Sequence, residues 1–414
     1  MLEKMKSAWR IPELRKKIIY TFGMLLLYRL LCCIPVPGVN IAAVSDAVKN
    51  FSVLDFMNMM TGGSFQNMTI MAMGITPYIN ASIILQLLTV AIPTLEKLAK
   101  EGPEGRKKIT EWTRYLTVAL AFIQAVGLVF AMRANSYGGI WYLVIGVSMA
   151  AGTSLAMWIG ERITENGIGN GISLLIMAGI VSNMFNWSRQ AVVGLIDGTV
   201  GIIAVLVVVL AFLVMIVAIT YVDMGERRIP VQYAKRMVGR KMYGGQSTHI
   251  PMKLNSTGVM PLIFGFAILQ FPATVFAFFP TSGINLWWQG FQSGVWYQVV
   301  LAVLIIAFTY FYTGITFNPA DISKNMQQNG GIIPGIRQGR ATTDYLARVS
   351  SRLTLFSALF IAVLATIPTI ITRLFGVSTP FAASSVLIAV SVGIETIRQI
   401  EAQMVMRHHK GFLG

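Results

Sequence analysis

Residues 68–92 read MTIMAMGITPYINASIILQLLTVAI, an apolar run in which one proline and two amides are embedded. As a helix, about 20 apolar residues cross the hydrocarbon core of a bilayer. Pro77 removes a backbone hydrogen bond and is expected to kink this helix. Asn80 and Gln86 carry amides, which are costly to expose to lipid. We therefore predict a membrane-spanning helix with one side facing another part of the protein or an aqueous space.

Apolar runs of this kind recur along the whole chain. Of its 414 residues, 55% are hydrophobic and 12% are charged, against roughly 25% charged in ordinary soluble proteins. Ten runs predict ten transmembrane helices, and so an all-α, polytopic membrane protein. The predicted spans are residues 18–34, 68–92, 112–132, 141–160, 171–187, 200–222, 258–279, 295–317, 353–372 and 381–400.

The basic residues orient these spans. The chain has 33 Lys and Arg against 17 Asp and Glu, which gives a net charge of +16. Nearly all the basic residues lie in the N-terminal tail or in segments on its side of the membrane. The opposite side carries only Lys49, Arg133, Arg189 and Arg373. Because basic loops stay in the cytoplasm, both termini are predicted to be cytoplasmic.

A short apolar segment lies between the first two spans. Residues 51–63 read FSVLDFMNMMTGG, and a helix over them would reach only about 20 Å, less than the membrane core. Asp55 and Asn58 interrupt its apolar face. Such half-spanning backbone survives at membrane depth inside protein or beside an aqueous cavity. We predict a short helix that dips into a funnel, with an interfacial helix on the outer surface as the alternative.

Ten spans also divide into five and five, which favours two halves of inverted topology, as in many transport proteins. The expected boundaries are residues 1–198 for the N-terminal half, with the short segment near 51–63, and 199–402 for the C-terminal half, with a cytoplasmic tail at 403–414.

Motifs for intrinsic catalysis are missing from the sequence. It contains no Walker loop, no HExxH and no GxSxG, so we expect no ATPase, no catalytic residues and no cofactor. The adjacent Cys32 and Cys33 do not form a disulfide framework, and no histidine lies in an apolar run, so no metal site is expected. Ionisable residues are scarce within the spans, which weighs against an ion-coupled transporter.

Two long loops on the cytoplasmic side, residues 223–257 and 317–352, concentrate basic and polar residues. In the first, apolar and polar residues alternate around 229–233, and Gly244-Gly245 predicts a turn, so we expect a protruding hairpin. Its charge favours a large acidic partner such as ribosomal RNA or a motor protein. Topology determination and lipid headgroup contact are the alternative.

Six motifs, in this order, resemble those of the SecY/Sec61-alpha family of protein-conducting channels. They are IPVPG at 34–38, AMGITPYINASIILQLL at 72–88, GIGNGIS at 167–173, YAKR at 233–236, QSTHIPMKLN at 246–255 and PGIR at 334–337. The resemblance covers essentially the whole chain. It implies an hourglass pore between the two halves, closed by a ring of aliphatic side chains and a short plug helix.

The resemblance also implies roles for particular residues. The pore ring would comprise Ile75, Ile79, Ile176, Ile180, Ile263 and Ile388. The plug would include Phe51, Leu54, Asp55, Met59, Gly62 and Gly63. A lateral gate between the second and seventh spans would include Asn80, Ile83, Gln86, Phe264 and Ala267. Docking of SecA or the ribosome would use Arg240, Lys241, Lys253, Arg337 and Arg340.

Two positions depart from the family pattern. Lys241 stands where arginine is common, which keeps the charge and loses bidentate geometry. Gln338 replaces a proline after Arg337, so we expect a less rigid turn there.

The implied function is a passive channel of the bacterial plasma membrane for unfolded secretory chains and membrane proteins. SecA or the ribosome would drive it, SecE would clamp it and SecG would assist. Signal sequences, unfolded polypeptides and membrane lipids would contact it. An accessory paralogue for specialised substrates and a secondary solute transporter are the alternatives.

Overall fold

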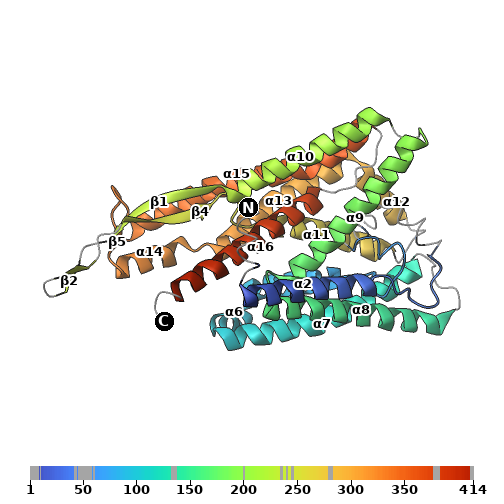
Figure 1. The fold of residues 1–414 in the computed structure, drawn as a ribbon, viewed down its shortest axis with the longest axis horizontal. Helices are drawn as coiled ribbons and strands as arrows, with labels where there is room; N and C mark the ends of the chain where they lie inside the picture. The colour runs from blue at the N-terminus through green and yellow to red at the C-terminus, as the bar shows by residue number, and fades with distance from the viewer. Residues whose placement is uncertain are drawn as a thin grey trace.

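The structure is a computed structural model of the chain (Figure 1). It describes residues 9, 11–41, 44, 58, 61–131, 138–198, 201–233, 236–238, 241–243, 247–277, 283–375 and 383–410.

The N-terminal part consists of helices joined by an irregular segment at 61–75. Its helices are α2 (Pro12–Leu31), α5 (Thr76–Ala91), α6 (Pro93–Lys100), α7 (Pro103–Ala131), α8 (Gly139–Asn166) and α9 (Gly171–Ile196). The C-terminal part contains α10 (Ile202–Met224), α11 (Met260–Ala277), α12 (Gly283–Ser293), α13 (Val295–Thr316), α14 (Pro319–Gln328), α15 (Arg340–Phe375) and α16 (Ala383–Lys410). Each of the ten predicted spans therefore overlaps a helix.

Length and composition qualify several of these helices as membrane spans. Among the described residues, six helices are long and apolar enough to cross a membrane. A seventh span results if α5 and α6 are one broken span, since they meet at an angle of 107°. The full set of ten spans stays a prediction.

The predicted second span differs in two ways from the structure. Its first residues are turns rather than helix, and they pair with the chain that leaves α2: the Val36 N–H donates to the Met68 carbonyl at 2.9 Å. Pro77 does not kink the helix but lies in the first turn of α5, where a helix needs no N–H donor. The bend lies instead at Ile92–Pro93, between α5 and α6.

The long helices pack in two groups. In the first, α8 packs against α2, α7 and α9, and α5 packs against α7. In the second, α15 packs against α13 and α16, α10 packs against α16, and α11 packs against α13. Contacts of α9 with α16 and of α7 with α11 join the two groups. In Figure 1, α2, α7 and α8 lie below α10, α13 and α15, and α9 extends from the first set toward the second.

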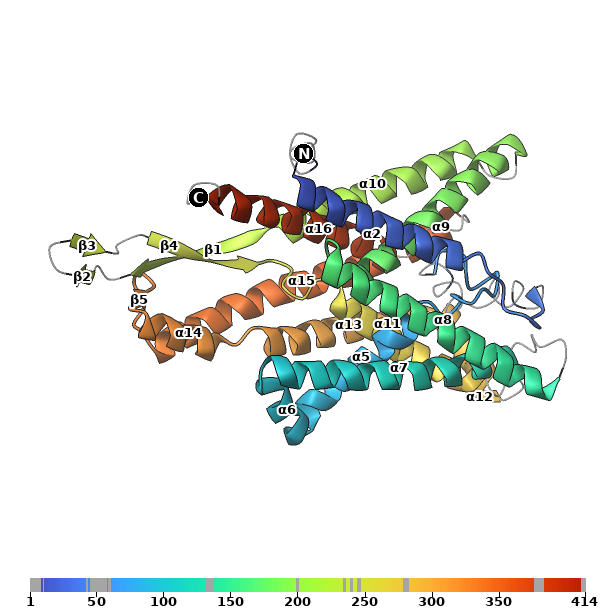
Figure 2. The ribbon, with the colours of Figure 1, turned by 60° about the horizontal axis from the view of Figure 1, so that its bottom comes forward.

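A small sheet projects from one end of the helices, opposite the end that carries α12 (Figure 2). β1 (Glu226–Tyr233) and β4 (Ser247–Lys253) pair antiparallel from Glu226↔Lys253 to Gln232↔Ser247, which confirms the predicted hairpin. Beyond them, β2 (Arg236–Val238) pairs with β3 (Lys241–Tyr243). The predicted turn at Gly244-Gly245 lies outside the described residues. β5 (Gly331–Ile332), from the second basic loop, pairs with the other edge of β1.

Candidate functional site

All six isoleucines proposed for the pore ring lie in one apolar cluster between the two groups of helices. Ile79 belongs to α5 and Ile75 is its N-cap residue, whereas Ile176 and Ile180 belong to α9. The C-terminal part supplies Ile263 from α11 and Ile388 from α16. Four of the six are buried, among them Ile180 and Ile388 with 2% exposure each. The fold thus brings together residues separated by up to 313 positions, from Ile75 to Ile388.

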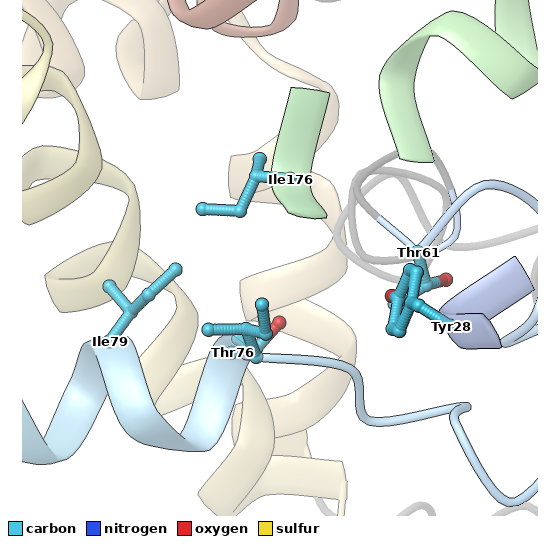
Figure 3. A pocket seen from close by; sticks show the side chains of 6 residues that line it. Tyr28, Thr61, Thr76, Ile79 and Ile176 are labelled. Atoms are coloured by element: carbon cyan, nitrogen blue, oxygen red, sulfur yellow. The ribbon is translucent and has the colours of Figure 1, made fainter. Parts of the chain in front are cut away.

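A small pocket opens inside this cluster. Its empty space is about 230 Å³, part of it open to solvent, and its lining residues are Tyr28, Thr61, Ile75, Thr76, Ile79 and Ile176. Figure 3 shows Ile79 and Ile176 on opposing helices, with Tyr28 and Thr61 next to each other on another side. The lining contains aliphatic groups and hydroxyls, and none of its residues is charged.

The end of the predicted plug segment is held against two helices. Arg29 Nη2 of α2 donates to the Gly62 carbonyl at 3.2 Å, and Asn183 Nδ2 of α9 donates to the Asn58 carbonyl at 3.3 Å. Gly62 has a φ of +66°, and a Cβ there would lie 2.8 Å from the Gly179 carbonyl oxygen of α9. Only glycine permits both this backbone conformation and this approach. Of the other predicted plug residues, Phe51, Leu54, Asp55 and Met59 lie outside the described residues.

The predicted gate residues occupy different environments. Ile83 is buried, Asn80 is half-buried and Gln86 is exposed on α5. The Phe264 ring is buried within the C-terminal group, with its centroid 5.5 Å from that of Phe308 and 6.0 Å from that of Tyr312 on α13. The side chain of Ala267 lies outside the described part of the structure.

Helix α7 was not among the elements predicted for the lateral gate. It belongs to the N-terminal group and packs against α11. The signal that singled out α5, an amide within an apolar run, is also present in α7 as the half-buried Gln124. Applied to every run, that signal would have included α7 among the candidates.

The two basic loops form a single platform, made of β1, β4, β5, α14 and the N-terminal turns of α15. Ile229 and Val231 alternate with exposed residues along β1 and are fully buried, as the pattern predicted. They pack in one apolar cluster with residues of the other platform elements, namely Met252, Met326, Ile333 and Leu346. The loops are therefore not two separate projections.

The platform presents Lys253, Arg337 and Arg340 as exposed side chains. Side-chain hydrogen bonds order the Arg337 loop, since Thr342 Oγ1 donates to the Arg337 carbonyl at 2.9 Å. Gln338 Nε2 also donates to the Gly331 carbonyl of β5 at 3.2 Å. This bond ties the loop to the sheet, and the expectation of a less rigid turn stays a prediction.

Two docking residues are described incompletely. Arg240 lies outside the described residues, and Lys241 lies in β3 with its side chain outside them. Within the described ranges, no group of three or more His, Cys, Asp and Glu side chains is placed to hold a metal ion.

The chain is similar to known proteins along its whole length. The sequence profile of the SecY family matches residues 69–397. The protein translocase subunit SecY of Streptomyces scabiei is 42% identical over 441 aligned residues, which cover 100% of this chain and 100% of that protein.

Solved structures share the fold. One described as the structure of a protein conducting channel superposes with a TM-score of 0.70 at 20% identity, covering 94% of this chain and 93% of that one. Sec61 in the canine ribosome-channel complex from the endoplasmic reticulum gives a TM-score of 0.67 at 19% identity, with coverages of 94% and 93%.

Proposed function

This chain belongs to the SecY family, and we propose that it forms the channel through which unfolded secretory proteins cross the bacterial plasma membrane and membrane proteins enter it. It is a multi-pass membrane protein and a channel subunit, not an enzyme. Energy for transport therefore comes from a partner, either SecA hydrolysing ATP or the translating ribosome. The full-length relative is a translocase subunit, so the solute-transporter interpretation is not favoured.

The observation that carries the proposal is the apolar cluster to which both groups of helices contribute. The proposed ring of Ile75, Ile79, Ile176, Ile180, Ile263 and Ile388 lies within it. Aliphatic side chains exclude ions by dewetting. They also lack any polar group that would bind one passing side chain more tightly than another. One ring of aliphatic side chains can therefore exclude ions and still let polypeptides of different sequence pass.

The proposed architecture is ten spans in two inverted halves, residues 1–198 and 199–402, around an hourglass pore, with residues 403–414 as a tail. The two packing groups support it, because most of the strongest helix contacts among the described residues lie within one group or the other. The basic platform supports a cytoplasmic location of both termini, because basic segments remain on the cytoplasmic side.

The closed channel would be sealed by the segment near 51–63 and opened sideways at a lateral gate. The contacts of Gly62 and Asn58 with α2 and α9 support the first part. We include α7 with α5 and α11 in the gate, because α7 and α11 are in contact. A lateral gate whose closed state is only marginally stable opens when an apolar signal helix binds the open state more tightly than the closed one.

The platform is the proposed docking surface for SecA or the ribosome. Exposed Lys253, Arg337 and Arg340 on an ordered scaffold support this role, together with Arg240 and Lys241. Clustered positive charge attracts phosphate groups and acidic protein surfaces. SecE as a clamp, SecG as an accessory subunit, and contacts with signal sequences and lipids complete the proposal.

Protease protection in proteoliposomes tests this function. The vesicles contain this chain, a SecE subunit and SecA, and the substrate is a precursor with an intact signal or one whose signal core carries two arginines. We expect protection that requires both ATP and the intact signal. Equal protection of the two precursors, or none while SecA is bound, would contradict the proposal for ordinary secretory substrates.

A further inference from the structure

A polar network lies at the root of the β1–β4 hairpin, where the platform meets the helices. Asp223 is in the last turn of α10, shortly before β1, and Asn255 follows β4. Asn255 Nδ2 donates to Asp223 Oδ1 at 2.9 Å, and the Leu254 N–H donates to the Gly225 carbonyl at 2.9 Å. These two hydrogen bonds therefore join the beginning of the hairpin to its end.

The same carboxylate also holds α16. Ser391 Oγ donates to Asp223 Oδ2, and Arg398 Nη2 donates to the Asp223 carbonyl at 3.3 Å. On the other side, Asn255 Oδ1 accepts hydrogen bonds from Ser357 Oγ of α15 at 3.1 Å and from Thr257 Oγ1 at 3.4 Å. We call Asp223, Asn255, Thr257, Ser357, Ser391 and Arg398 the Asp223 network.

Burial makes the hydrogen bonds around Asn255 consequential, while Asp223 and Ser391 are half-buried. Asn255, Thr257 and Ser357 are 6%, 4% and 2% exposed. A buried polar group that loses its partner retains the full cost of desolvation, and bonds to a carboxylate are roughly twice as strong as neutral ones. The network therefore holds the hairpin, α15 and α16 in one relative arrangement.

Two helices that leave this network lead into the apolar cluster of the pore. On α16, Ile388 lies one turn before Ser391, and Val392 follows it; both are buried in the cluster. After Asn255, the chain enters α11 through Val259, and both Val259 and Ile263 pack against the same cluster. A displacement of the hairpin root would therefore move ring residues of the C-terminal half.

We propose that Asp223 is a positioning residue that couples a partner docked on the hairpin to the helices α11 and α16, which line the C-terminal side of the pore. Asp223 touches neither the translocating chain nor the docked partner. It transmits a tilt of the hairpin to α16 through Ser391 and Arg398, and to α11 through Asn255. This inference rests on the proposed channel function.

The test uses the complete channel complex in proteoliposomes and compares three measured quantities. These are the affinity of SecA for the vesicles, the precursor translocated per ATP hydrolysed, and the thermal unfolding temperature. Asp223→Asn keeps the shape of the side chain and removes its charge, while Ser391→Ala removes one donor. The matched control is Ser154→Ala, because Ser154 is a helical serine whose hydroxyl bonds its own helix at the Ala150 carbonyl.

For Asp223→Asn we expect unchanged SecA affinity and translocation per ATP reduced about tenfold, as for the loss of one hydrogen bond to a charged group. The unfolding temperature should fall only slightly. Ser391→Ala is expected to lower translocation per ATP less, and Ser391→Thr to restore it. The double variant Asp223→Asn with Asn255→Asp returns a carboxylate to the same hydrogen bond and should recover part of the loss.

Unchanged translocation per ATP in Asp223→Asn would overturn the inference. A fall in unfolding temperature that matches the loss of transport, with no recovery by Ser391→Thr, would assign the network a purely structural role and also overturn it. If the unaltered chain fails to protect a precursor, the proposed function fails. If it succeeds and only the variants contradict expectation, the coupling alone fails.

Discussion

The apolar cluster around Ile180 and the platform around Arg337 are built by different interactions. The cluster gathers side chains from helices far apart in sequence, and packing of aliphatic groups holds it. The platform combines strand pairing, a small apolar core and side-chain hydrogen bonds that order one loop. Changes of volume should therefore disturb the cluster most, whereas changes of charge or hydrogen bonding should disturb the platform most.

Reversal of charge on the platform should have the largest effect. Arg337→Glu is expected to lower SecA-driven translocation by roughly 100-fold, because like charges facing each other across an interface cost several kcal/mol. The protein should still fold, because the Arg337 side chain is exposed. Translocation with purified SecA measures the effect. Arg348→Glu, an exposed change on helix α15, which follows the Arg337 loop, is the control. An equal loss in both variants would contradict a specific role for Arg337.

Removal of volume from the cluster tests the seal. Ile79→Gly with Ile180→Gly should raise the ion conductance of the resting channel several-fold, since a wider ring admits water. Each change should also lower the free energy of unfolding by about 2–5 kcal/mol, as for other large-to-small changes in a core. Planar-bilayer recordings measure the conductance.

The control for the ring is Ile145→Gly, in a separate apolar cluster with Val129 and Met149. It should reduce stability without raising the resting conductance. An equal leak in both variants would mean that loss of packing, and not the ring, causes it.

Two neighbouring glycines distinguish contact from backbone strain at the end of the plug segment. Gly62 and Gly63 both have positive φ, so alanine is strained at either position by about 1–2 kcal/mol. At Gly62 an added Cβ would also lie 2.7 Å from Arg29 Nη1 and 2.8 Å from the Gly179 oxygen, whereas at Gly63 its nearest neighbour is 4.0 Å away. Gly62→Ala should therefore leak more ions at rest than Gly63→Ala. Equal resting conductance of the two variants would contradict a specific packing contact at Gly62.

Loss of one loop hydrogen bond should have the smallest effect. Gln338→Ala removes the bond to the Gly331 carbonyl, worth about 1 kcal/mol. We expect SecA affinity to fall about 5-fold, measured on vesicles at fixed salt. The control is Gln328→Ala, an exposed change at the end of α14, which should leave the SecA affinity unchanged. Equal SecA affinity of the two variants would show that the Gln338 bond does not order the docking loop.

Local sequence pattern predicted the position of the helices well, because apolar composition and length act within a single segment. It also predicted the β1–β4 hairpin from the alternation at Ile229 and Val231. It was wrong at Pro77, because a proline has the same sequence signature at the start of a helix and within one. The preceding residues 68–75 are as apolar as a helix, yet contacts with the chain after α2 keep them as turns.

For the candidate site, motif resemblance named six isoleucines, and the fold places all of them in one cluster. The role of each residue stays a proposal. The contacts of Arg29 with Gly62 and of α7 with α11 were not predicted. The first has no local signature, because it joins segments that are distant in sequence. For the second, the amide of Gln124 within an apolar run was the available signal.

The sequence by itself determined a polytopic, basic, non-catalytic helical protein with a basic hairpin, since composition and periodicity are properties of single segments. Only the tertiary structure decided that β5 pairs with β1 and merges two basic loops into one platform. It alone also placed Ser391 of α16 on the carboxylate of Asp223, 168 residues earlier. These contacts depend on which strand edges and polar groups still lack a partner once the helices pack. The packing of the helices in turn depends on the whole chain.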